Sequence, residues 1–181
     1  MKKINWFSFV ASGVLLALSF SVSADEPAKI AFVDTGNTGR SVTAEALANA
    51  VIGEKKLHVA VISRAVDMDP FDVMPEPNAA TLLKKRGLDV TAHRAVQLTS
   101  NDVHHADVIL TMTNKHKSKV LELYPDAKAK TFTISEYVTG ESKDIADAWG
   151  KPMEVYEQMF AQVNQYIAPV LEKKVPKKPA S

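Results

Sequence analysis

The chain has 181 residues, no cysteine, and a nearly balanced charge of 22 basic against 21 acidic residues. The missing cysteines exclude disulfides, thiolate metal ligands and any cysteine nucleophile. The near-neutral balance argues against nucleic acid as the main partner, and the length fits one domain that buries a sizeable core.

The first 24 residues have the pattern of a secretory signal. Lys2 and Lys3 precede an apolar run over residues 6–20, and small residues follow it up to Ala24. The run is short for a membrane span and no stop-transfer pattern follows. We therefore expect cleavage after Ala24, export to the periplasm and no membrane attachment afterwards. Retention as an N-terminal anchor is the alternative.

The rest of the chain alternates between apolar runs and helical patterns. The apolar runs are rich in Val, Ile, Phe or Thr and do not alternate cleanly, which predicts strands covered on both faces at Lys29–Val33, His58–Ile62, Val108–Met112 and Lys130–Ile134. Helices are predicted from Val42 to about Gly53 and at Pro77–Gly87, Ser100–His105, Lys115–Leu123 and Met153–Leu171. This alternation predicts an α/β domain over residues 25–173 with parallel strands and right-handed crossovers. Residues 174–181 are predicted to be a basic disordered tail.

Residues 34–41, with the sequence Asp-Thr-Gly-Asn-Thr-Gly-Arg-Ser, lie between the first predicted strand and the first predicted helix. A strand that leads through a glycine-rich turn into a helix directs several backbone N–H groups at one point, and this arrangement binds anions. Arg40 adds a planar fork that suits phosphate oxygens. The segment is therefore predicted to be a phosphate-binding loop.

The spacing Asp34-x5-Arg40-Ser41 resembles the Cys-x5-Arg-Ser loop of the low-molecular-weight protein tyrosine phosphatases. Further segments resemble that family in the same order, namely 63–65, 87–94, 106–113, 136–137 and 144–150. The resemblance implies a four-stranded parallel sheet of order 2-1-3-4 flanked by helices. Two segments resemble the protein-arginine phosphatase branch of the family. They are the loop sequence Thr-Gly-Asn-Thr that ends at Thr38, and the sequence Glu-Tyr-Val-Thr-Gly that begins at Glu136. Arsenate reductases share this fold, but their reaction needs cysteines, so that activity is excluded.

The resemblance also implies roles for individual residues. Asp34 replaces the nucleophilic cysteine, and Asp147 matches the general acid that protonates the leaving group. Trp149 is expected to line the substrate channel. Ala148 replaces the usual proline after the acid, which is expected to loosen that loop. The predicted phosphate-binding residues are Thr35, Gly36, Asn37, Thr38, Gly39, Arg40 and Ser41.

The carboxylate at residue 34 leaves three hypotheses open. Asp34 can fill the anion nest itself by accepting the amide hydrogen bonds and pairing with Arg40, which gives the loop less reason to bind phosphate and favours lost turnover. The preserved loop, Arg40 and Asp147 then favour a pseudo-phosphatase that binds a phosphate-bearing ligand or a protein partner. Alternatively, Asp34 is the nucleophile of an active phosphotyrosine or phosphoarginine phosphatase, with Asp147 as its acid. In the third hypothesis the loop is a remnant in a structural or interaction protein.

The predicted partner is a phosphorylated protein or a small phosphate ligand, and no cofactor is expected. Known aspartyl-phosphate enzymes typically use a divalent metal, but no acidic cluster accompanies Asp34. Metal binding at Asp144 with Asp147, or at His104 with His105, is disfavoured because other ligands at a useful spacing are missing.

Overall fold

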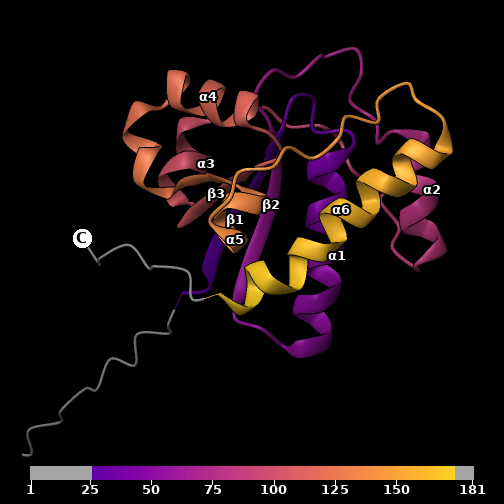
Figure 1. Ribbon diagram of the computed structural model, residues 1–181, viewed down its shortest axis with the longest axis horizontal. Coiled ribbons are helices and arrows are strands. Elements are labelled where there is room, and N and C mark those ends of the chain that lie inside the picture. Colours follow the sequence, from indigo (N-terminus) through magenta and orange to yellow (C-terminus); the bar gives the residue numbers. More distant parts are fainter. Residues whose placement is uncertain (1–25, 174–181) are drawn as a thin grey trace, which may run out of the picture.

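The computed structural model describes residues 26–173, so the predictions for residues 1–24 and 174–181 lie outside it. Within it, four parallel strands form one sheet in the order β2-β1-β3-β4, as predicted. The strands are β1 (Ala28–Asp34), β2 (Val59–Ala65), β3 (Val108–Thr111) and β4 (Thr131–Thr133). Figure 1 shows the sheet between its helices.

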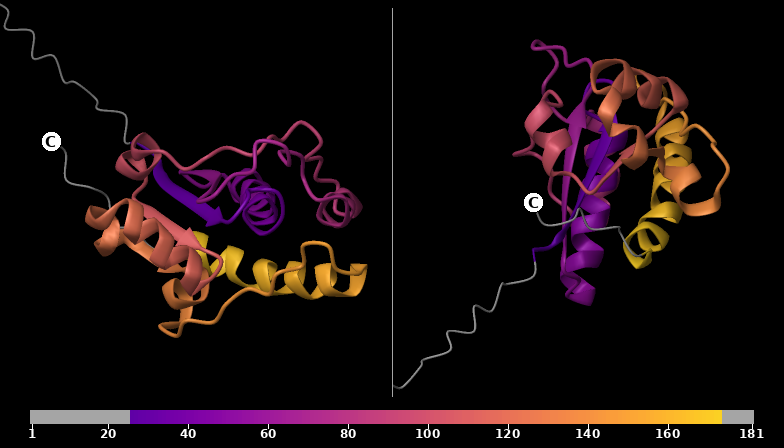
Figure 2. Two further views of the ribbon diagram at one scale, coloured as in Figure 1. Left: turned by 90° about the horizontal axis from the view of Figure 1, so that it is seen from above. Right: turned by 90° about the vertical axis from the view of Figure 1, so that its left-hand side faces the viewer.

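Helices cover both faces of the sheet, as the two views in Figure 2 show. One face packs against α1 (Arg40–Lys55), α2 (Pro77–Lys85), α5 (Ile134–Thr139) and α6 (Met153–Glu172). The other packs against α3 (Ser100–His105), α4 (Asn114–Leu123) and the 3-10 helix η1 (Pro125–Lys130). Strands buried on both faces explain why their sequences are continuously apolar.

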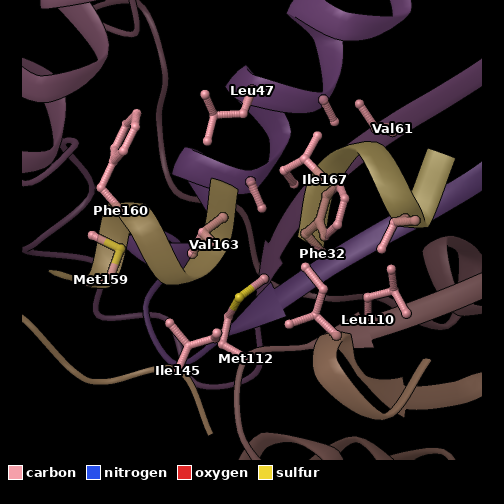
Figure 3. Packing of buried hydrophobic residues seen from close by; sticks show 14 of the residues in the cluster. Phe32, Leu47, Val61, Leu110, Met112, Ile145, Met159, Phe160, Val163 and Ile167 are labelled. Atoms are coloured by element: carbon pink, nitrogen blue, oxygen red, sulfur yellow. The ribbon is translucent and has the colours of Figure 1, made fainter. Parts of the chain in front are cut away.

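The larger core lies between the sheet and α1 and α6. Phe32 and Leu110 project from β1 and β3 toward Leu47 of α1 and toward Val163 and Ile167 of α6, as the close view in Figure 3 shows. These side chains are at least 95% buried. Burial of such side chains contributes about 1.5–3 kcal/mol each and fixes the end of β1 that leads into the loop.

The last predicted strand was too long, and the helix that follows it was missed. Thr133 ends β4 and caps α5, because its side chain accepts from the Glu136 amide while the Glu136 carboxylate accepts from the Thr133 amide. This reciprocal capping box stops the strand before Ile134. The predicted start at Thr99 is confirmed by a similar capping box with Asp102.

The first helix begins at Arg40, two residues earlier than predicted, so the loop between β1 and α1 is short. This loop lies at the carboxyl end of β1, where open parallel sheets place ligands. The β2–α2 and α5–α6 connections lie at the same end of the molecule (Figure 1). No helix within residues 26–173 combines the length and hydrophobicity needed to cross a membrane.

Candidate anion-binding site

The β1–α1 loop is held in shape by Asn37. Its backbone has a φ of 58°, which is a left-handed conformation that asparagine tolerates better than most residues. The Asn37 side chain donates from Nδ2 to Ser41 Oγ at 3.0 Å and accepts from the Val96 amide at 3.0 Å. His93 Nε2 lies 2.9 Å from the Asn37 carbonyl oxygen. His93 therefore supports the loop.

Replacing Asn37 by alanine should lower the free energy of unfolding by about 3 kcal/mol, because a partly buried amide loses its acceptor and alanine is less tolerant of the left-handed turn. Urea unfolding monitored by circular dichroism measures the change. Asn49→Ala, at an exposed position of α1, is the matched control and should stay within about 0.5 kcal/mol of wild type. Equal losses in the two variants would contradict this role for Asn37.

Asp34 lies at the base of the loop, where it is only 3% exposed. One carboxylate oxygen accepts from the Asn37 amide at 2.6 Å, and the other accepts from the Ser41 amide at 2.9 Å. The expectation that Asp34 accepts loop amide hydrogen bonds is therefore confirmed. Within residues 26–173, we find no protein acceptor for the amides of Gly36, Thr38, Gly39 and Arg40. These four N–H groups are free to bind an anion above the carboxylate.

The Arg40 guanidinium does not pair with Asp34, so that part of the prediction was wrong. Arg40 is buried and donates to Asp147 Oδ2 at 3.1 Å and to the Ile145 carbonyl oxygen at 3.4 Å. The reason is that the α5–α6 connection crosses the loop and brings a second carboxylate within reach. Because the Asp147 side chain is 62% exposed, an incoming oxyanion has room to displace it from Arg40.

The segment that carries Asp147 is attached to the core on one side. The Ile145 amide donates to the Met112 carbonyl at 2.9 Å, and the Ala146 amide donates to Gln162 Oε1 at 3.0 Å.

Trp149, the predicted channel residue, is 65% exposed on the same connection. Asp144 accepts from both the backbone and the side chain of Asn114. No cluster of metal-ligand type was found among the described residues.

His116, in the first turn of α4, contacts the loop and was missed by the sequence analysis. Its Nε2 lies 2.8 Å from Thr35 Oγ1, and its Nδ1 is buried with no hydrogen-bond partner among residues 26–173. Burial, followed by the positive charge of Arg40, lowers the pKa of His116 to about 4. The only sequence signal is its place just after the end of β3, at the same edge of the sheet as Asp34.

The low pKa of His116 predicts that acid destabilises the protein. Between about pH 6.5 and 4 the unfolded imidazole binds a proton and the folded one does not, so stability falls as the pH drops through this window, by on the order of 3 kcal/mol. His116→Gln should remove this part of the slope in urea unfolding between pH 7 and 4. His105→Gln, at an exposed site, should retain the wild-type slope. Parallel curves for wild type and His116→Gln would contradict the assignment.

Glu76 is the second loop contact that the sequence did not reveal. It precedes α2, and its Oε1 accepts from Thr38 Oγ1 at 3.3 Å. Burial raises the pKa of Glu76, and the negative charges of Asp34 and Asp147 add to the rise. Pro75 and Pro77 on either side were the only hint that this residue has a fixed position.

A cavity of about 1050 Å³ lies elsewhere, between α3, η1 and α5, and its lining includes Val108 at the amino end of β3. It contains none of the predicted site residues. The loop, Arg40 and Asp147 therefore form the candidate site, at the opposite end of the sheet.

The sequence profile described as low molecular weight phosphotyrosine protein phosphatase matches residues 29–180. The chain belongs to this family. A protein-arginine-phosphatase from Geobacillus stearothermophilus is 36% identical over 147 residues, which cover 81% of this chain and 96% of the relative.

Two solved structures extend the comparison. The low molecular weight protein tyrosine phosphatase from T. tengcongensis has a TM-score of 0.75 and 34% identity, covering 80% of this chain and 98% of its own. A mutant of the YwlE arginine phosphatase with a phosphorylated active-site serine has a TM-score of 0.76 and 31% identity, covering 80% and 93%. The fold and its strand order are thus those of the family.

Proposed function

We propose that this protein is an exported pseudo-phosphatase that binds a phosphate-bearing ligand, or a phosphorylated protein partner, at the loop between Asp34 and Ser41. The proposal rests on which hydrogen-bond donors of the loop already have an acceptor within the protein. Asp34 occupies two loop amides, four others have no protein acceptor within residues 26–173, and the Arg40 guanidinium pairs with an exposed carboxylate that an oxyanion can replace. The nucleophile is replaced while the binding geometry is retained.

Binding at this loop requires the ligand to replace an internal ion pair. Phosphate oxygens would take Arg40 from Asp147, and the bidentate pairing of a guanidinium with phosphate compensates for the lost carboxylate contact. The negative charge of Asp34 opposes a dianion, as the family's thiolate also does. The proposal therefore predicts measurable but moderate affinity for small oxyanions.

Isothermal titration with inorganic phosphate, vanadate, O-phosphotyrosine and Nω-phosphoarginine tests the proposal. We expect saturable 1:1 binding of at least one of these ligands below millimolar concentration. No binding of any of them would overturn the proposed ligand site and leave the loop as a remnant. Export is supported by the sequence of residues 1–24, and recovery of a shortened chain in the periplasmic fraction tests it.

The second candidate is catalysis by Asp34, and one specific observation favours it. In the YwlE mutant structure an active-site serine carries the phosphoryl group, so an oxygen nucleophile accepts phosphorus in that relative. Here an Asp34 oxygen would bond to phosphorus while the bond from phosphorus to the leaving group breaks, with Asp147 supplying the proton. Water would then hydrolyse the acyl phosphate.

The ion pair between Arg40 and Asp147 weighs against this second candidate, because it stabilises the carboxylate that would have to be protonated. Turnover of an aryl phosphate or of phosphoarginine that disappears in Asp34→Asn and Arg40→Ala would establish Asp34 catalysis. Equal rates for wild type and Asp34→Asn would rule it out.

A further inference from the structure

The cavity between α3, η1 and α5 has the size of a small-molecule site, although it lies at the opposite end of the sheet from the loop. Its volume of about 1050 Å³ is close to the upper limit of the roughly 300–1,000 Å³ that ligand pockets span. Apolar and aromatic side chains form much of its wall, among them Val103, Val108, Leu123 and Phe132. Such a wall favours a ligand that buries apolar surface against it.

Tyr137 lines this cavity on the α5 side and carries a buried hydroxyl group with no hydrogen-bond partner among residues 26–173. The residue is only 6% exposed. Burial raises the pKa of the Tyr137 hydroxyl, so the group keeps its proton at neutral pH and is a donor. A buried donor without an acceptor is costly, and a ligand oxygen supplies the acceptor that the described chain does not.

Lys173 places a positive charge beside the same tyrosine. Its Nζ lies 4.7 Å from the centre of the Tyr137 ring and donates to the Tyr137 carbonyl oxygen. Lys173 also lines the cavity, and it forms no ion pair with a carboxylate among residues 26–173. An ammonium group carries three protons, and the carbonyl takes one of them. A donor hydroxyl and an ammonium on one side of an apolar cavity together suit a carboxylate.

The acidic residues of the cavity wall do not cancel this arrangement. Glu136 accepts from Lys117 Nζ with both carboxylate oxygens, at 2.9 and 2.7 Å. Its negative charge is therefore compensated by a lysine outside the wall. The other two carboxylates, Asp107 and Asp126, come from the α3–β3 connection and from η1, not from α5. The uncompensated charge next to the tyrosine is thus the positive one.

We propose that this cavity is a second ligand-binding site, which takes an apolar monocarboxylate of the medium-chain fatty acid type. The ligand carboxylate accepts from the Tyr137 hydroxyl and pairs with the Lys173 ammonium. The alkyl chain lies against the apolar part of the wall, which includes Phe132 and Leu123. Because the loop takes no part in this site, the inference does not depend on the proposed function.

Isothermal titration with decanoate tests the site. We expect saturable 1:1 binding below millimolar concentration, and about tenfold weaker binding of decanol, which has the same chain but no charge. Tyr137→Phe and Lys173→Met should each weaken decanoate binding about tenfold. The control Lys128→Met, at an exposed η1 lysine outside the cavity wall, should match wild type. Ala129→Trp, at an exposed position of the wall, should fill the space and abolish binding.

Thermal unfolding separates a ligand-facing hydroxyl from a structural one. Because removal of a buried donor that lacks an acceptor is stabilising, Tyr137→Phe should raise the midpoint of unfolding by about 3 °C. A lower midpoint in this variant would show that the hydroxyl is bonded inside the protein and would overturn the inference. Absence of decanoate binding by wild type, or equal affinities of wild type and Tyr137→Phe, would also overturn it. Full binding by Ala129→Trp would place decanoate elsewhere and have the same consequence.

Discussion

The Asp34→Cys variant should hydrolyse para-nitrophenyl phosphate at a rate at least roughly a thousandfold above that of wild type, because removing a nucleophile from an optimised site costs about 10⁶ and the surrounding groups are still in place. The Asn37 and Ser41 amides that now hold Asp34 would stabilise a thiolate. Steady-state release of nitrophenolate measures the gain. A gain of this size would show that the missing cysteine thiol is the main obstacle to catalysis at this loop.

Two further variants make that result interpretable. Asp34→Asn should be as inactive as wild type, and Arg40→Ala combined with Asp34→Cys should abolish the gained activity. Comparable rates for wild type and Asp34→Cys would favour catalysis by the carboxylate. No activity in either wild type or Asp34→Cys would point to a remnant loop or to a misplaced Asp147.

Arg40→Ala should weaken binding of inorganic phosphate about 100-fold, because the guanidinium supplies two charge-assisted hydrogen bonds worth about 3 kcal/mol together. Stability should change little, since the abandoned Asp147 side chain is 62% exposed and regains water. Isothermal titration and urea unfolding measure the two effects separately. This combination distinguishes a ligand-binding arginine from a structural one.

Arg40→Lys is the conservative comparison and should show an intermediate loss, because lysine keeps the charge but not the planar fork. Arg86→Ala, which removes an exposed guanidinium at the end of α2, should leave phosphate affinity unchanged. A large loss of stability in Arg40→Ala without any phosphate binding in wild type would instead support the remnant hypothesis.

The carboxylate of Asp34 accepts from two backbone amides of the loop, and within residues 26–173 no protein acceptor was found for four others. The structure differs from the sequence-based expectation at Arg40, which pairs with Asp147 and not with Asp34. Asp34 is therefore held by backbone amides of the loop, and the Arg40 guanidinium is not needed to hold it.

Strand–loop–helix order and loop composition were readable from the sequence because they depend on local features. Apolar runs marked buried strands, and the glycine-rich stretch before Arg40 marked the loop. The extent of β4 was not readable, because Thr133 and Thr131 are equally suited to a strand, and the reciprocal bond to Glu136 decides where the strand ends. Boundaries of this kind depend on capping geometry that a pattern of hydrophobicity does not record.

By itself, the sequence determined the fold, the loop between the first strand and the first helix, and the loss of cysteine chemistry. Only the tertiary structure decided that Arg40 pairs with Asp147 and that His116 and Glu76 contact that loop. Asp147, His116 and Glu76 reach it from 107, 81 and 38 residues away along the chain. The segments that carry these three side chains lie at the carboxyl edge of the sheet. Their positions there depend on how α2, α4 and α6 pack. Local sequence preferences determine where each helix and strand forms. The chemistry of the site depends on which connecting segments come together at the carboxyl edge of the sheet.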